Sequence, residues 1–202
     1  MTHSLIWHPA TYVKEFDSNG FPPPHLHRLI SLAGLSVEWW DTTPPVVRLW
    51  ATLRNDPTPL LQRFDAELAT ADEMVTLSGV RFGLPVLRCN ALSQSVVMEN
   101  FVHKPHFDLA EEIGGGFDVL TKVFGLPARA RLDVKAAWDN KKHRAMIAKR
   151  LMCDCTLIAL AYGRYQRMRG VLPSEHYALY EQAVLDAAAE KTKWVRKAFN
   201  HE

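Results

Sequence analysis

One acidic side chain, Asp154, lies on the apolar face of a long basic segment near the C-terminus. Residues 141–169 read KKHRAMIAKRLMCDCTLIALAYGRYQRMR, and apolar residues recur in this run at steps of three and four, which predicts a helix with one buried face. Asp154 falls between Leu151 and Ile158 on that face and is the only acid in the run, against eight lysines and arginines. A buried carboxylate is costly unless a metal ion, a cation or hydrogen-bond donors receive it. Asp154 therefore either belongs to a functional site or forms an ion pair with a nearby arginine.

Histidines supply two weaker candidates for metal ligation. His25 and His27 are two residues apart on an extended segment, but they follow a run of three prolines, and we expect both on the surface. His103, His106 and Asp108 could together form a metal cluster, because imidazole and carboxylate groups are common metal ligands.

Aromatic and glycine-rich segments are further candidates for contacts with bases and phosphates. Trp39, Trp40 and Trp50 could stack nucleobases, although packing in the core is the default for such residues. The run Gly114–Gly116 lacks the lysine and the strand–loop–helix context of a phosphate-binding loop, so we interpret it as a turn.

The elements that would position these residues are strands in the first half and mainly helices in the second. Apolar alternation and short apolar runs predict strands over 4–8, over 28–37 with a continuation into 38–40, over 46–52 and over 74–77. Helical periodicity and capping signals predict helices over 57–69, after Gly79, and over 117–124, 134–138, 141–169 and from Pro173 onward. This order indicates an α/β protein with a mixed sheet flanked by helices.

Composition indicates an ordinary globular protein. A chain of 202 residues with 48% hydrophobic and 23% charged residues is expected to form a single domain, 1–202. The net charge of +2 is too small to indicate nucleic-acid binding by itself, but the segment 141–169 concentrates positive charge. Three cysteines in no zinc-binding pattern, together with no signal peptide and no membrane-spanning run, lead us to expect reduced thiols, a cytoplasmic location and no membrane contact.

Residues 74–92, MVTLSGVRFGLPVLRCNAL, carry a family resemblance. The run resembles the second motif of 3′–5′ exonucleases related to the proofreading domain of family-B DNA polymerases: an apolar strand, Asn-Gly, two variable residues, Phe-Asp, then Leu-Pro and a helix. The resemblance extends over most of the chain, through segments 21–28, 106–109, 114–127 and 154–170. It implies a ribonuclease-H-like fold, with a mixed five-stranded sheet, flanking helices and a helical C-terminal half. It also places Asp108 at the edge of a strand or helix, which favours a structural role.

Catalysis in that family requires four carboxylates that hold two divalent ions, one activating water and the other stabilising the leaving oxygen. In the first motif, His8 stands in place of the aspartate and Ala10 in place of the glutamate, with Glu15 and Asp17 nearby in reversed order. In the second motif, Ser78 replaces the asparagine and Gly83 the aspartate. In the third, Asp154 is retained, but Arg150 replaces the water-orienting tyrosine.

These replacements imply a degenerate exonuclease-like domain that is catalytically inactive. Mg²⁺ prefers several oxygen ligands, so one histidine and one aspartate would hold at most a single weak ion, and we expect no metal cofactor. Arg150 lies one helical turn before Asp154 and can take over the charge role of the ions, so we expect Asp154 to pair with Arg150, His8 or both.

The remaining activity expected from the resemblance is binding of single-stranded DNA or RNA, or of a protein complex that processes nucleic acid. The contact surface would comprise Ser78, Arg81, Phe82, Lys141, Lys142 and Arg144. One alternative is an active 3′–5′ exonuclease that uses Mg²⁺ or Mn²⁺ with atypical ligands such as His8, Asp108 and Asp154. Another is a structural subunit that serves as a docking platform in a larger assembly.

Overall fold

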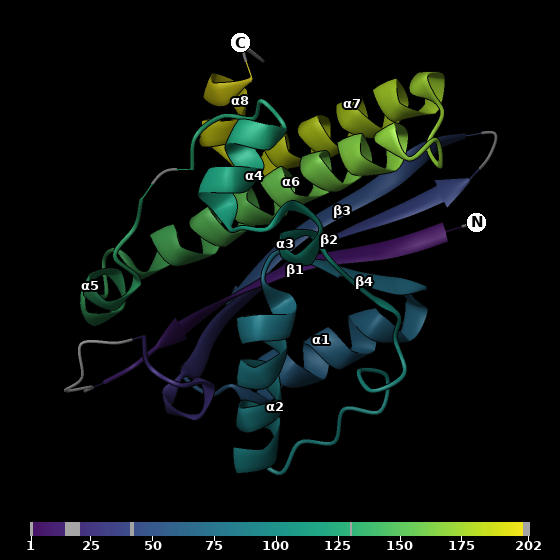
Figure 1. Cartoon of the computed structure of the whole chain (residues 1–202). Helices are drawn as coiled ribbons and strands as arrows, with labels where there is room; N and C mark the ends of the chain where they lie inside the picture. Colours follow the sequence, from purple (N-terminus) through teal and green to yellow (C-terminus); the bar gives the residue numbers. More distant parts are fainter. Residues whose placement is uncertain (1, 15–20, 41–42, 130, 200–202) are drawn as a thin grey trace.

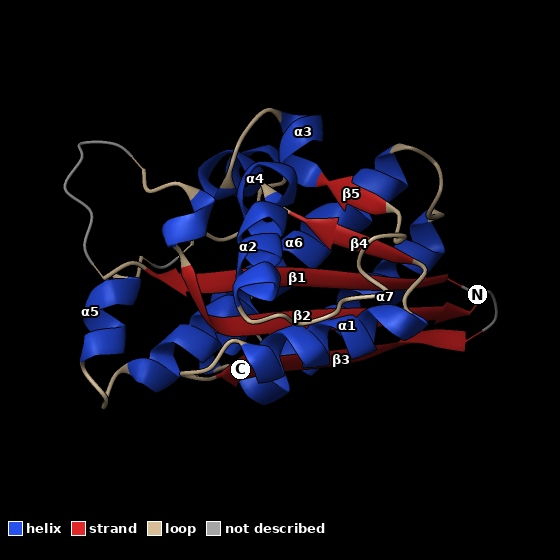
Figure 2. Cartoon of the chain, turned by 90° about the horizontal axis from the view of Figure 1, so that it is seen from below, coloured by secondary structure: helices blue, strands red, loops and turns tan. Residues whose placement is uncertain are grey.

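A mixed five-stranded sheet forms the centre of the molecule (Figure 2). The computed structural model describes residues 2–14, 21–40, 43–129 and 131–199. The strands are β1 (Thr2–Tyr12), β2 (Arg28–Trp40), β3 (Thr43–Leu53), β4 (Glu73–Thr76) and β5 (His106–Asp108), in the spatial order β3-β2-β1-β4-β5. β1, β2 and β3 pair antiparallel, whereas β4 and β5 run parallel to β1.

β1 is apolar along most of its length because both faces of the sheet are covered. Leu5 and Trp7 pack on one face with α1 (Thr58–Thr70) and α2 (Leu84–Ser93). Ile6 and Ala10 point to the opposite face and join a second core cluster. Alternate residues of a strand point to opposite faces, so β1 contributes to both clusters.

The second face of the sheet is covered by α6 (Arg144–Met168) and α7 (Ser174–Lys191), which lie side by side over it (Figure 1). The shorter helices are α3 (Leu109–Ile113), α4 (Phe117–Val123), α5 (Val134–Asp139) and α8 (Lys193–Ala198), with a 3₁₀ turn at Pro24–Leu26 and a π-helix at Gly79–Gly83. The predicted α/β class, with a mixed sheet and a helical C-terminal half, is confirmed.

Asp108 fixes the loop that follows β4. Its carboxylate accepts hydrogen bonds from the backbone N–H groups of Ser78 (2.7 Å), Val80 (2.9 Å) and Ala110 (3.1 Å), the last of these capping α3. His106 lies beside Thr76, with 2.8 Å between the imidazole Nε2 and the hydroxyl oxygen. Asp108 therefore lies at the end of β5 and the start of α3, as expected for its position.

Two of the candidate tryptophans, Trp39 and Trp50, pack against other parts of the fold. Trp39 contacts the rings of His176 and Tyr180 on α7. Trp50 packs over Gly34 on the neighbouring strand, where a Cβ atom would come within 2.5 Å of the indole. This position therefore requires glycine. The side chain of Trp40 lies outside the described residues. Gly114 ends α3 in the left-handed region at φ 68°, as expected for a turn.

Candidate functional site

Asp154 of α6 lies at the centre of a cluster of basic side chains. Its side chain is fully buried, and its two oxygens accept hydrogen bonds from Arg129 Nε (3.0 Å) and Nη2 (2.9 Å). Arg150 Nε donates to Oδ1 at 2.8 Å, and His8 Nε2 lies 3.8 Å from Oδ2. The expected pairing with Arg150 is therefore present. Arg129, which sequence reasoning did not single out, contributes the second guanidinium.

Phe117 orients the two members of the cluster that do not belong to α6. The Arg129 guanidinium lies 4.1 Å above the centre of the Phe117 ring, and His8 meets the same ring edge-on at 5.3 Å between centroids. Arg129 comes from the segment between α4 and α5, and His8 comes from β1. The cluster therefore brings β1, α4 and the segment between α4 and α5 together at Asp154.

The cluster carries a net positive charge. Burial lowers the pKa of His8 to about 4, against the opposing attraction of Asp154, so the imidazole is neutral at pH 7. Burial also lowers the pKa of Arg150, but a guanidinium is so strong a base that it stays protonated at pH 7. Two arginines thus face one carboxylate. Arg150 Nη1 is buried and has no hydrogen-bond acceptor among the described residues.

A groove of about 780 Å³ opens beside this cluster. We call it the β1–α6 groove, because His8, Ala10 and Thr11 of β1 line one side and residues of α6, including Arg150 and Asp154, line the other. His8 and Ala10 point to the same face of the strand, as the first motif requires. The groove also takes in Phe21, His27, Phe82, Asp118, Arg129, Arg131 and Asp133.

An aromatic cluster stands at one end of the β1–α6 groove. The Phe21 ring stacks on His27 at 5.2 Å, and Phe82 meets His27 edge-on at 4.9 Å. Phe21 is 75% exposed, whereas Phe82 is half-buried. The Phe21 ring is therefore exposed, and it packs against the rings of His27 and Phe82.

The expectation that His27 lies on the surface is wrong. His27 is buried, and its Nε2–H donates to the Pro22 carbonyl at 2.9 Å while Nδ1 accepts from the Thr11 hydroxyl at 2.7 Å. Asn90 of α2 holds the backbone by donating to the His27 carbonyl at 2.8 Å. The proline run thus folds back onto β1 instead of projecting into solvent. His25 is exposed, as expected.

The residues of the second motif do not all lie where the sequence predicts. Phe82 lines the groove, but Ser78 and Arg81 do not, and Arg81 instead pairs with Glu111 at 3.1 Å. Gly83 is buried against Trp7 on the opposite face of the sheet, where a Cβ atom would lie 3.0 Å from the indole. The position that the family resemblance assigns to a metal-binding aspartate therefore faces away from Asp154.

The predicted basic residues near the start of α6 lie outside the lining of the groove. Lys141 and Lys142 are exposed in the turn between α5 and α6. The Arg144 guanidinium lies 4.2 Å over the Trp138 ring and donates to the Trp138 carbonyl at 2.6 Å, so it is engaged in local packing.

The atypical ligand set considered for an active enzyme is not assembled. Asp108 uses its carboxylate on backbone N–H groups and does not line the groove that contains His8 and Asp154. Among the described residues, no group of three or more histidine, cysteine or acidic side chains could hold a metal ion. Glu15 and Asp17 lie outside the described residues.

Comparisons with known proteins find similarity in structure only. No protein-family profile and no curated protein matches the chain. The family B DNA polymerase from the hyperthermophilic archaeon Pyrobaculum calidifontis is similar to all of this chain, with 14% identity and a TM-score of 0.62. The zinc-bound complex of E. coli ExoI with single-stranded DNA covers 85% of this chain, with 12% identity and a TM-score of 0.46.

The likeness to the polymerase confirms the ribonuclease-H-like fold that the sequence resemblance implied. This chain spans 29% of the polymerase chain and 42% of the ExoI chain, so it corresponds to one part of each. No described helix has the length and apolar character needed to cross a membrane.

Proposed function

We propose that this chain is an exonuclease-like domain that binds single-stranded nucleic acid in the β1–α6 groove without cleaving it. The observation that carries the proposal is the state of Asp154, the retained position of the third motif: two arginines occupy its carboxylate oxygens. A carboxylate bound in this way has little capacity left for a divalent ion. His8 and Ala10 supply no further carboxylate on the same side of the groove.

The groove nevertheless retains features suited to a strand of nucleic acid. Arg129, Arg131 and Arg150 border it, and phosphate groups are attracted to guanidinium groups. Phe21 presents an exposed ring at one end, where a base can stack irrespective of its sequence. The comparison protein with the TM-score of 0.62 is a DNA polymerase, which supports nucleic acid as the ligand class.

We expect a fluorescent single-stranded oligonucleotide to bind at low salt and to remain intact with Mg²⁺ or Mn²⁺. Anisotropy should show affinity that falls with salt by about 0.7 log units per log unit of salt for each phosphate contacted. Release of nucleotides from a 3′-labelled strand should equal that of a protein-free control.

Two outcomes would replace this proposal. Metal-dependent nucleotide release that disappears in Asp154→Asn would establish an active exonuclease with atypical ligands. Intact, folded protein that binds no oligonucleotide at low salt would favour the docking platform, with a nucleic-acid-processing complex as its partner.

Replacing Phe21 with alanine should weaken oligonucleotide binding by about 1–3 kcal/mol, because the exposed stacking ring is lost. Leu92→Ala is the matched control, since Leu92 is 81% exposed on α2 and does not line the β1–α6 groove. Anisotropy titrations of both variants would measure the difference. Equal affinities for the two variants would remove Phe21 from the interface.

A further inference from the structure

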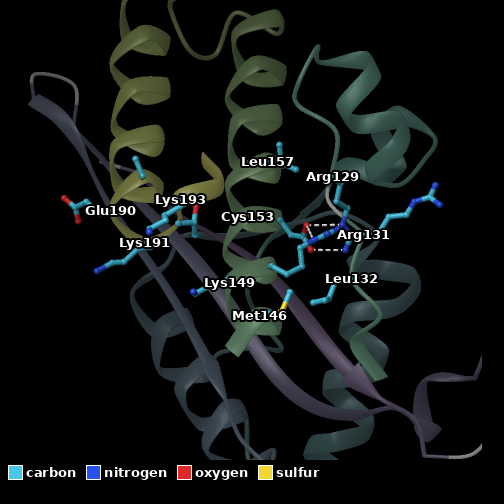
Figure 3. Close-up of a pocket in the computed structure, with 14 residues that line it drawn as sticks. Arg129, Arg131, Leu132, Met146, Lys149, Cys153, Leu157, Glu190, Lys191 and Lys193 are labelled. Atoms are coloured by element: carbon cyan, nitrogen blue, oxygen red, sulfur yellow. Dashed lines mark hydrogen bonds and ion pairs between the residues drawn. The ribbon is translucent and has the colours of Figure 1, made fainter. Parts of the chain in front are cut away.

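A second cavity, of about 520 Å³, lies against another side of the Asp154 cluster. It is bounded by α6, by the end of α7 with the start of α8, and by the segment that carries Arg129, Arg131 and Leu132 (Figure 3). We call it the α6–α7 cavity. It shares five lining residues with the groove, Arg129, Arg131, Leu132, Arg150 and Asp154, but its wall on the α7 side is separate.

The α6–α7 cavity is strongly basic. Six cationic residues and two acidic residues line it: Arg129, Arg131, Lys149, Arg150, Lys191 and Lys193, against Asp154 and Glu190. Asp154 is already matched by Arg129 and Arg150. Lys149, Lys191 and Lys193 are exposed and form no ion pair with any carboxylate in the described part of the chain. The cavity therefore has positive charge available for an anion.

Apart from Thr192, apolar side chains form the rest of the lining: Leu132, Met146, Cys153, Leu157 and Ala189. Met146 is 49% exposed, and a flexible thioether side chain adapts readily to a ligand surface. A cavity with an apolar lining and a few placed polar groups, in this size range, is typical of small-molecule sites. The β1–α6 groove differs from it in charge, because three aspartates accompany its three arginines.

We propose that the α6–α7 cavity binds a mononucleotide-type ligand, an organic phosphate monoester attached to a planar, largely apolar group. Lysine ammonium groups can contact the phosphate dianion from the α6 and α7 sides, while the ring system covers Met146 and Leu157. Three available lysines suit a dianion better than a monocarboxylate. This ligand is additional to the strand in the β1–α6 groove.

Calorimetric titration of the whole chain with adenosine monophosphate tests this site, with adenosine and inorganic phosphate as separate probes. Adenosine monophosphate should bind saturably, and each fragment should bind at least tenfold more weakly. The variant K149Q/K191Q/K193Q should lose at least tenfold in affinity for adenosine monophosphate. The matched control K141Q/K142Q changes exposed lysines that line neither cavity, and it should retain the parent affinity.

Two further measurements separate this site from the proposed groove. Phe21→Ala should leave adenosine monophosphate affinity unchanged, and K149Q/K191Q/K193Q should still bind adenosine monophosphate measurably less well even if oligonucleotide binding is absent in every variant. Loss of adenosine monophosphate affinity in Phe21→Ala, with none in the triple variant, would place the nucleotide in the groove and overturn the proposal. No binding at millimolar concentration, or equal binding of inorganic phosphate, would also overturn it.

Discussion

Replacing Asp154 with alanine is expected to lower the free energy of unfolding by about 3–5 kcal/mol. The substitution leaves two guanidinium groups next to each other without the carboxylate that both contact. Most of the energetic cost arises at Arg150, because its side chain is only 11% exposed and water cannot replace the lost carboxylate. Arg129 is partly exposed and will recover some hydration, which moves the expected loss toward the lower end of the range.

Urea unfolding followed by circular dichroism at pH 7 measures this effect. Asp139→Ala is the matched control, because Asp139 forms a one-turn pair with Lys135 in which both side chains are more than half exposed, and such pairs contribute little. Asp154→Asn separates charge from volume, since the amide fills the same space, and most of the loss should persist. An Asp154→Ala protein as stable as the Asp139→Ala protein would show that the cluster does not stabilise the fold.

The apolar periodicity of 141–169 was sufficient to predict that Asp154 is buried and that Arg150, one turn earlier, contacts it. Helical geometry fixes the relative positions of residues four apart, so this part of the site follows from the sequence. Arg129 lies in a segment without regular structure, and no periodicity relates it to α6. Its contact with Asp154 depends on how the chain returns between α4 and α5, which only the structure shows.

The second motif contains a backbone irregularity that its sequence pattern did not indicate. The motif spacing predicts Gly83 beside the catalytic face, but Gly79–Gly83 forms a π-helix, in which each residue turns through a smaller angle than in an α-helix. Phe82 consequently borders the β1–α6 groove while Gly83 packs against Trp7. A family pattern carries residue order, but it does not carry this local change in helical geometry.

Strand prediction succeeded where apolar runs were long and missed the shortest strand. β2 and β3 were located correctly, although β3 is longer at both ends than the predicted 46–52. β5 has three residues, His106–Asp108, too few for a period of two to be recognised. The α6–α7 cavity could not be predicted from the sequence, because Lys149 and Lys191 come together only through the packing of α6 against α7.

Acidification from pH 7 to pH 4 should destabilise the protein through His8 by about 2–3 kcal/mol. The folded state holds the pKa of His8 at about 4, below the ordinary value of 6.5 that applies to the unfolded chain. Above pH 6.5 the imidazole is neutral in both states and contributes nothing to the pH dependence. Between pH 6.5 and pH 4 the unfolded chain binds a proton that the folded protein excludes, so stability falls as the pH is lowered.

His8→Gln should remove this contribution, so that the change in unfolding free energy per pH unit between pH 6 and pH 4.5 decreases by roughly 1 kcal/mol. His106 has a pKa lowered by burial and acts in the same direction, so part of the acid sensitivity will remain. His143→Gln is the matched control, because His143 is exposed before α6, and its pH profile should follow that of the parent. Urea unfolding at a series of pH values compares the three proteins.

Parallel profiles for His8→Gln and the parent would mean that His8 takes up its proton as readily in the folded state as in the unfolded chain. Below pH 6.5 the Asp154 cluster would then hold an imidazolium, and its charge would be larger by one than with neutral His8.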